Sequence, residues 1–85
     1  MSINPTGVSQ LTHESGGRVY KVWMRRRARP DRREGICGGR IVRLNISCLT
    51  TGCAVCSWDG RAWTRRPGSQ ESRAAAREVL DLYNW

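Results

Sequence analysis

The sequence predicts an α+β domain in which four antiparallel strands form a meander and one C-terminal helix packs on a face of the sheet (ββββα). Three observations indicate this fold class. Apolar and polar residues alternate in short segments up to residue 66, glycine-containing turns separate these segments, and apolar residues recur at three- or four-residue spacing after residue 69. The 85 residues suffice for one domain. We expect a flexible, polar, Gly/Ser-rich arm over 1–17 and a single domain over 18–85.

Alternation is clearest in the first two expected strands. The segment 19–26 places Tyr20, Val22 and Met24 on one side and Val19, Lys21 and Trp23 on the other. The segment 40–49 alternates in the same way, with Val42, Leu44, Ile46 and Cys48 against Arg43, Asn45 and Ser47. Pro30 and the pair Gly38-Gly39 break regular structure between these two segments, so a long connection is expected there.

Two further strands are expected over 53–58 and 61–66, joined by Asp59-Gly60. That pair is typical of a two-residue type I′ turn, which requires positive φ at both positions. Ser69 is the expected N-cap of the helix, and Glu71 lies in the first turn, where the helix dipole favours an acid. The apolar stripe of the helix consists of Ala75, Ala76, Val79, Leu80, Leu82 and Tyr83.

The turns also predict how the strands pair. A two-residue turn at Asp59-Gly60 and a four-residue loop over 49–52 give one apolar face and one mixed face. The mixed face holds Arg43, Asn45, Ala54, Cys56, Trp58, Arg61, Trp63 and Arg65. Indole rings stack on bases and arginines bind phosphates or guanine edges, so this face is a candidate binding surface. Two alternatives remain: the arginines lie over the indoles as cation–π pairs, or the helix covers this face and the tryptophans belong to the core.

Arginine sets the charge of the chain, since 14 of its 15 basic residues are arginines and the formal charge is +8. Six of them fall within residues 25–33 beside one acid: Arg25, Arg26, Arg27, Arg29, Arg32 and Arg33. Unpaired guanidinium groups are costly to bury, so this segment must face water or a polyanion. Nucleic acid is the expected partner, because neutralised phosphates release counterions. The alternative is a solvated basic loop with no dedicated partner.

The four cysteines are Cys37, Cys48, Cys53 and Cys56, and the spacing of the last two is typical of zinc or redox sites. Cys48, Cys53 and Cys56 are the possible zinc ligands, with His13 as a spare fourth. Within a regular strand, however, Cys53 and Cys56 point to opposite faces. We therefore expect no cofactor and structural or free thiols. A Cys48–Cys53 disulfide would require an oxidising compartment.

No grouping of residues indicates catalysis. His13 has only Glu14 as an acidic neighbour, and the carboxylates are not paired for acid–base chemistry. We expect neither an enzyme nor a small-molecule substrate. No apolar run approaches the roughly 20 residues of a membrane span, and the N-terminus does not read as a signal peptide. A cytoplasmic protein with no membrane partner is expected.

Residues 53–82 combine a hairpin at Asp59-Gly60-Arg61, the pair Gly68-Ser69, and an alanine-rich helix over 73–77. This pattern resembles the C-terminal half of double-stranded-RNA-binding domains, which implies phosphate contacts near the helix start, with Arg73 as the nearest match. The order of three strands and a helix also resembles the arm-binding domains of tyrosine recombinases and their AP2-like relatives. That resemblance implies a sheet in the DNA major groove, with Arg43, Arg61, Trp63 and Arg65 as readers. In size and composition the chain is similar to phage accessory proteins, including anti-CRISPR proteins.

Two functions follow as predictions. The first is a noncatalytic module that binds DNA or RNA through the arginine segment and the mixed Arg/Trp face. The alternative is a phage-type inhibitor that binds an acidic surface of a host nucleic-acid-handling complex and blocks it. In that alternative the arginines steer the encounter and the tryptophans anchor the contact.

Overall fold

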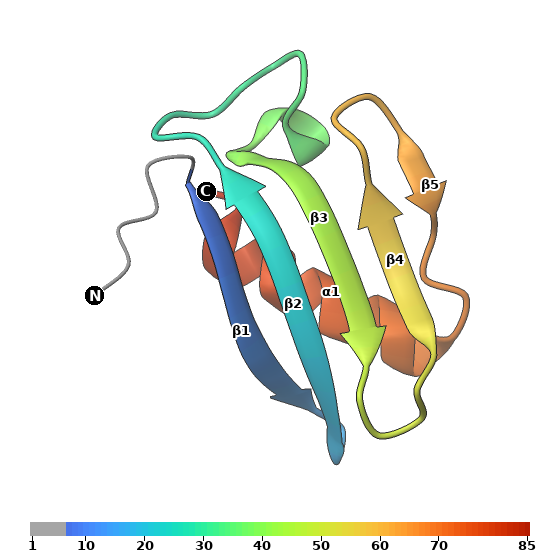
Figure 1. Ribbon diagram of the computed structural model, residues 1–85. Helices are drawn as coiled ribbons and strands as arrows, with labels where there is room; N and C mark the ends of the chain where they lie inside the picture. The colour runs from blue at the N-terminus through green and yellow to red at the C-terminus, as the bar shows by residue number, and fades with distance from the viewer. Residues whose placement is uncertain (1–6) are drawn as a thin grey trace.

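A computed structural model describes residues 7–85, which form a five-stranded antiparallel sheet with one helix behind it (Figure 1). The strands lie side by side in chain order: β1 (Val8–Ser15), β2 (Arg18–Arg26), β3 (Ile41–Cys48), β4 (Ala54–Trp58) and β5 (Trp63–Arg65). A short 3-10 turn, η1 (Ile36–Gly38), precedes β3, and the helix α1 (Gln70–Tyr83) crosses one face of the sheet. The α+β class and the C-terminal helix are confirmed, but the sheet has five strands instead of four.

The additional strand, β1, lies where the sequence predicted a flexible arm. It pairs with β2 along its whole length, from Val8 opposite Arg25 to Ser15 opposite Arg18. Gly16 and Gly17 close the hairpin with φ of 58° and 78°, which glycine adopts without steric cost. The arm prediction is therefore wrong for residues 8–15, and residues 1–6 lie outside the described residues. An edge strand with one face in water needs few apolar residues, so its sequence is nearly as polar as a loop.

The core fills the space between the sheet and α1. Tyr20, Val22 and Met24 of β2 are at most 1% exposed, and Leu44, Ile46 and Cys48 of β3 are at most 4% exposed. These side chains pack with Ala75, Ala76 and Val79 of the helix. The alternation predicted for both strands is thus confirmed. Ser69 caps the helix as expected, because its Oγ accepts a hydrogen bond from the Ser72 N–H at 3.1 Å.

Asn84 joins the end of α1 to the start of β3. Its side chain is buried, with Nδ2 donating to the Ile36 carbonyl at 2.8 Å and Oδ1 accepting from the Ile41 N–H at 2.9 Å. Its carbonyl accepts from the Arg40 N–H at 2.7 Å. A Cβ at Gly39 would collide with the Asn84 side chain, so glycine is required there for space. One residue therefore fixes the chain on both sides of Gly39.

The pairing of β4 differs from the predicted register. A bulge between Ile46 and Ser47 leaves Val55 as an extra residue, so that Cys56 lies opposite Ile46 and Trp58 opposite Leu44. A bulge of one residue reverses the facing of every later residue in the strand. Cys56 and Trp58 therefore lie on the core side of the sheet, and the predicted pairing of this strand, which set Val55 opposite Ile46, is wrong from Val55 onward.

The turn after β4 is longer than the two-residue hairpin that was predicted. The Asp59 carboxylate accepts hydrogen bonds from the N–H groups of Arg61 at 2.8 Å and Ala62 at 2.9 Å. This side-chain bonding extends the turn to Ala62, and Trp58 pairs with Trp63 instead of Arg61. Among residues 7–85, no helix has the length and apolar character needed to cross a membrane.

Candidate functional site

Trp58 and Trp63 contribute to the core and are not displayed together for binding. Their rings meet edge to face with centroids 5.3 Å apart and an interplanar angle of 70°. Both are half-buried against the core cluster, and the Trp58 indole N–H donates to the Glu34 carbonyl at 2.8 Å. The predicted mixed Arg/Trp face is therefore wrong, because the bulge in β4 turns these rings toward the core. The two tryptophans pack against the core, as one alternative expected, but α1 does not cover the predicted mixed face, because Arg43 and Asn45 lie on the face opposite the helix.

The arginines predicted beside these rings lie elsewhere. Arg43 pairs across the sheet with Arg25, on the face opposite α1, and its Nη1 donates to the Val42 carbonyl at 2.8 Å. Arg65 is exposed opposite Ser57, on that same face. Arg61 is exposed in the turn between β4 and β5. The structure does not gather these three arginines around the two indoles.

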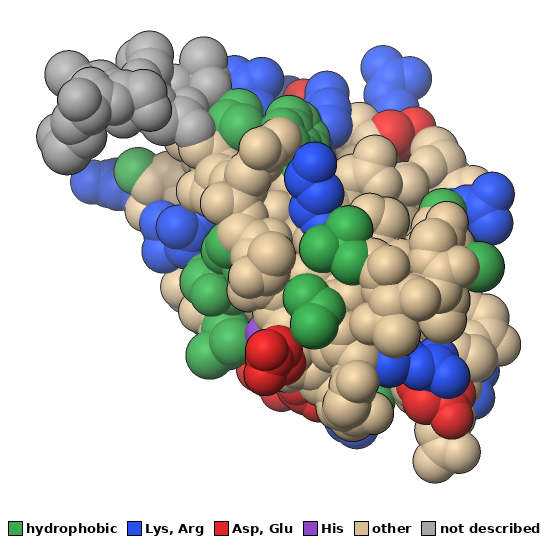
Figure 2. All heavy atoms as spheres, turned by 60° about the horizontal axis from the view of Figure 1, so that its bottom comes forward, with side chains coloured by type: hydrophobic (Ala, Val, Ile, Leu, Met, Phe, Trp, Pro, Cys, Tyr) green, Lys and Arg blue, Asp and Glu red, His purple; other side chains and the backbone are tan. Residues whose placement is uncertain are grey.

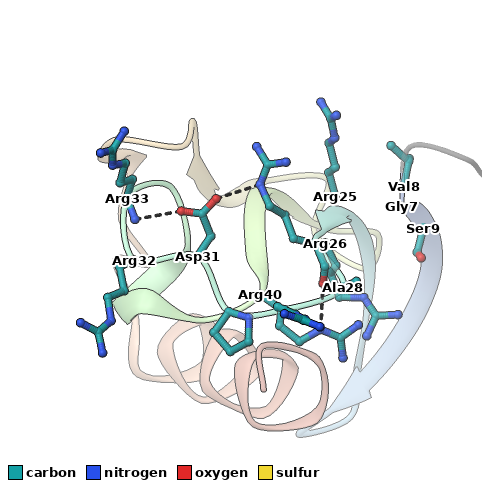
Figure 3. Close-up of a pocket in the computed structure, with 13 residues that line it drawn as sticks. Gly7, Val8, Ser9, Arg25, Arg26, Ala28, Asp31, Arg32, Arg33 and Arg40 are labelled. Atoms are coloured by element: carbon teal, nitrogen blue, oxygen red, sulfur yellow. Dashed lines mark hydrogen bonds and ion pairs between the residues drawn. The ribbon is translucent and has the colours of Figure 1, made fainter.

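The loop after β2 forms an open hollow lined by arginines (Figure 3), with a volume of about 1030 Å³. We call it the arginine hollow; its arginines are Arg25, Arg26, Arg27, Arg29, Arg32, Arg33 and Arg40, and Asp31 is the acid in its lining. All six arginines predicted from the segment 25–33 line it. Sequence reasoning missed Arg40. Since antiparallel pairing sets the start of β3 beside the end of β2, that pairing was the signal that would have found it.

Part of the arginine set holds the loop in shape. The Arg27 guanidinium contacts Asp31 (Nε to Oδ2, 2.8 Å) and Glu34 (Nη2 to Oε2, 3.0 Å). Arg40 donates from Nε to the Arg27 carbonyl at 2.9 Å, and the Arg26 guanidinium lies 5.4 Å from the centre of the Tyr83 ring. The hydrogen-bond donors or the charge of these three guanidinium groups are thus engaged by other groups of the protein. We therefore assign Arg26, Arg27 and Arg40 mainly to bracing the hollow.

Asp31 sets the backbone path of the loop. Its Oδ1 accepts from the N–H groups of Arg33 at 2.9 Å and Glu34 at 3.0 Å, and its own N–H donates to the Gly39 carbonyl at 2.9 Å. The two hydrogen bonds from backbone N–H groups, followed by the nearby charge of Arg27, hold the pKa of the Asp31 carboxyl below its ordinary value. The carboxylate is thus ionised at neutral pH, and the loop is tied to the start of β3.

Arg29, Arg32 and Arg33 have a different environment. All three are exposed, and their guanidinium groups make no ion pair with any acid within residues 7–85. Figure 3 shows Arg32 and Arg33 directed outward from the loop. Their charges are therefore left for an external anion, on a loop whose backbone is already fixed.

Within residues 7–85, large apolar side chains are exposed only at scattered places. Leu49, Leu82 and Trp85 are 54%, 61% and 63% exposed, and they belong to a turn, the helix and the C-terminus. In Figure 2, hydrophobic side chains form small separate patches, while Lys and Arg side chains project at the upper, left and right margins. A partner of polar, anionic chemistry fits this surface better than an apolar one.

The cysteines predicted as possible zinc ligands differ in burial. Cys48 and Cys56 are buried on the core side, whereas Cys53 is exposed, and the four thiols form no disulfide. Burial raises the pKa of the Cys56 thiol to about 12, so it remains protonated. Within residues 7–85, no three side chains of the metal-binding types gather at one place.

His13 lies on β1 and is not a residue of a flexible arm. Its Nε2 is 2.8 Å from Glu78 Oε1, and Ser15 Oγ donates to Glu78 Oε2 at 2.9 Å. These two hydrogen bonds, that from His13 first, lower the pKa of the Glu78 carboxyl. The group joins β1 to α1. Because the Ser15 hydroxyl bonds the carboxylate and not the imidazole, the arrangement lacks the nucleophile–base contact of a catalytic triad.

In comparisons with known proteins, no family model, no curated protein and no solved structure matches this chain. The function is therefore inferred from the chemistry of the arginine hollow and of the sheet beside it.

Proposed function

We propose that this chain is a cytoplasmic, noncatalytic nucleic-acid-binding module whose arginine hollow takes the phosphate backbone. The observation that carries the proposal is the set of seven arginines around one hollow with a single carboxylate in its lining. Guanidinium groups bind phosphate oxygens through paired N–H donors, and each neutralised phosphate releases condensed counterions. Arg29, Arg32 and Arg33, which have no acidic partner within residues 7–85, are the expected phosphate contacts.

The fixed backbone of the loop supports this role. Arg27, Asp31 and Arg40 connect residues 27–34 to the start of β3 through hydrogen bonds of 2.8–2.9 Å. A loop that is already ordered loses less conformational entropy when it binds, so more of the contact energy appears as affinity. The alternative is a solvated basic loop with no dedicated partner. It does not explain why so many internal contacts hold these like-charged arginines together.

The alternative function, a phage-type inhibitor of a host complex, relied on tryptophans as anchors. Trp58 and Trp63 pack against the core and against each other, and the Trp58 indole N–H is engaged by the Glu34 carbonyl, so they do not form the displayed pair on which that alternative relied. Protein interfaces gain most of their affinity from such buried aromatic anchors, whereas phosphate binding needs mainly cations. The arrangement therefore favours nucleic acid over an acidic protein surface.

The test compares two triple variants that remove the same charge. In one, Arg29, Arg32 and Arg33 are changed to Ala; in the control, the exposed arginines Arg66, Arg73 and Arg77 outside the hollow are changed to Ala. Fluorescence anisotropy would follow binding of labelled oligothymidylate, oligouridylate and a DNA duplex of the same length, at salt from about 50 to about 200 mM.

We expect binding at about 50 mM salt that weakens steeply as salt rises. The hollow variant should bind every probe less tightly, and its log–log salt slope on single strands should be about 2 units shallower, at about 0.7 per lost contact. The control variant should change the slope little. No binding of any probe by the unaltered protein, or equal losses in both triple variants, would overturn the proposal.

A further inference from the structure

We infer that the open face of the sheet binds single-stranded nucleic acid, with Trp23 as the ring on which a base stacks. This inference rests on the proposed function and adds the form of the polynucleotide and the surface that reads it. The open face is the one opposite α1, which Figure 1 shows uncovered in front of the helix.

The strand register places five side chains in one row across this face. The paired residues are Gln10, Trp23, Asn45, Ser57 and Arg65, one from each strand. Trp23 stands on β2 between two amides, since Gln10 and Asn45 are its direct neighbours and both are exposed. The indole is half-buried and points away from Tyr20, Val22 and Met24, which fill the core.

The chemistry of the row suits a base. An indole face stacks on any base, because every base has a π-face. Amide side chains hydrogen-bond base edges, since they carry both a donor and an acceptor, and an arginine can pair with phosphate or with guanine. Ser57 Oγ donates to Asn45 Oδ1 at 3.4 Å, which helps to orient the amide beside the ring.

Stacking on a sheet requires a base whose face is free. In a duplex both faces of each base are covered by neighbouring bases, so a ring standing on a broad sheet cannot reach them. Single strands can splay their bases onto such a surface while their phosphates follow cationic side chains. This difference selects the single strand over the duplex.

The open face is continuous with the arginine hollow. The next row toward the hollow contains Arg25 and Arg43 as a cross-strand pair, and Arg25 also lines the hollow. Lys21 follows on the other side of Trp23, and Glu14 is the acid of β1 on this face. A single strand of nucleic acid whose phosphates bind at the hollow therefore passes Arg25 and Arg43 before it reaches the row that contains Trp23. The charge of the face complements a polyanion.

The experiment uses two substitutions at Trp23 and a matched control. Trp23→Leu keeps apolar bulk but removes the ring, Trp23→Phe keeps a smaller ring, and Trp85→Leu makes the same change at an exposed tryptophan outside the sheet. The probes are oligothymidylate, oligouridylate, a DNA duplex and inorganic polyphosphate, a polyanion without bases. The two single-stranded probes show whether DNA or RNA is preferred.

Trp23→Leu should weaken both single-stranded probes by about 5- to 150-fold, the effect of losing one stacked base, without changing the salt slope. Its affinity for polyphosphate and for duplex should be unchanged. Trp23→Phe should remain within about threefold of the unaltered protein, because a ring is retained. Trp85→Leu should bind all probes normally.

A second measurement needs no substitution. Photo-crosslinking of bromouridine-containing RNA, followed by peptide mass spectrometry, should place an adduct on Trp23. If crosslinks form only on other residues, or if Trp23→Leu is folded and binds oligothymidylate and oligouridylate normally, the inference is overturned while binding at the arginine hollow stands. If no polynucleotide binds at all, the proposed function itself fails.

Discussion

Asn84→Ala should destabilise the whole domain, although the residue lies next to the C-terminus. The Asn84 amide is 1% exposed and satisfies two backbone groups on either side of Gly39, the Ile36 carbonyl and the Ile41 N–H, at 2.8 and 2.9 Å. Both of those residues are also buried. Alanine would leave the Ile41 N–H without a partner where water does not reach it, and the Ile36 carbonyl would keep only its hydrogen bond from the Gly39 N–H at 2.8 Å.

The magnitude follows from one orphaned donor and one lost hydrogen bond. An unsatisfied buried group costs about 1–3 kcal/mol and a lost hydrogen bond about 0.5–1.5 kcal/mol, so the change should cost about 3 kcal/mol in total. Small domains have roughly 5–15 kcal/mol of stability, and for a chain of this size 1 kcal/mol shifts the Tm by about 4–8 °C. We therefore expect the Tm to fall by about 12–24 °C.

The assay is urea unfolding followed by tryptophan fluorescence, with Leu82→Ala as the control. Leu82 is two residues away and 61% exposed, so its truncation should change the free energy of unfolding by less than about 0.5 kcal/mol. The midpoint for Asn84→Ala should fall with an unchanged m-value. If Asn84→Ala costs no more than Leu82→Ala, the view that this amide anchors the start of β3 is refuted.

Two further predictions concern the contacts that hold the loop and β1. Arg27→Ala removes the guanidinium that pairs with Asp31 and Glu34, so amide hydrogen exchange over residues 28–35 should accelerate while the strands stay protected; unchanged exchange there would contradict the bracing role. The pKa of Glu78 is lowered by hydrogen bonds from His13 and Ser15, so its stabilising effect exists above its ordinary value of 4.5 and is lost as pH falls through the lower folded-state value. The Tm difference between the unaltered protein and Glu78→Gln should therefore shrink as pH falls below 4.5, and a difference independent of pH would argue against this contact.

The predictable parts of the fold were those with a strong local pattern. Alternation indicated β2 and β3 within one or two residues of their observed bounds, and Ser69 gave the start of α1. The apolar stripe gave the buried face of α1 except at Leu82, which is 61% exposed. The first strand, β1, was missed because its own sequence is nearly as polar as a loop. It is a strand because it pairs with β2 along its whole length. Strand propensity reflects how the side chains of a segment pack on a half-buried sheet. It therefore carries little information about an edge strand that is held by backbone hydrogen bonds.

The register of β4 against β3 was also predicted wrongly, and this error changed the candidate site. The bulge at Val55 leaves no signature in the residue types, because Val55 and Cys56 are both suited to burial. The one-residue shift moved Trp58 into the core and left Trp23 as the aromatic residue of the central row on the open face. Alternation in β2 already placed Trp23 opposite Tyr20 and Val22, so the correct aromatic was available in the pattern. The cluster of arginines was predicted from the sequence alone. Which of these arginines brace the loop is shown only by their contacts in the folded structure.

The arginine hollow leads to a last prediction, because like charges held together oppose folding. Seven guanidinium groups surround one hollow, and three of them, those of Arg29, Arg32 and Arg33, make no ion pair with an acid within residues 7–85. At low ionic strength the repulsion acts over about 10–30 Å, and high salt screens it. Changing Arg29, Arg32 and Arg33 to Ala should therefore raise the Tm in low salt and lose that advantage near 1 M salt, while the triple variant at Arg66, Arg73 and Arg77 should show a smaller gain. Inorganic polyphosphate should raise the Tm of the unaltered protein, since a ligand of the folded state stabilises it by mass action. A hollow variant that melts earlier than the unaltered protein in low salt would mean that these arginines stabilise the fold, and the argument that they are kept for an external anion would lose its physical basis.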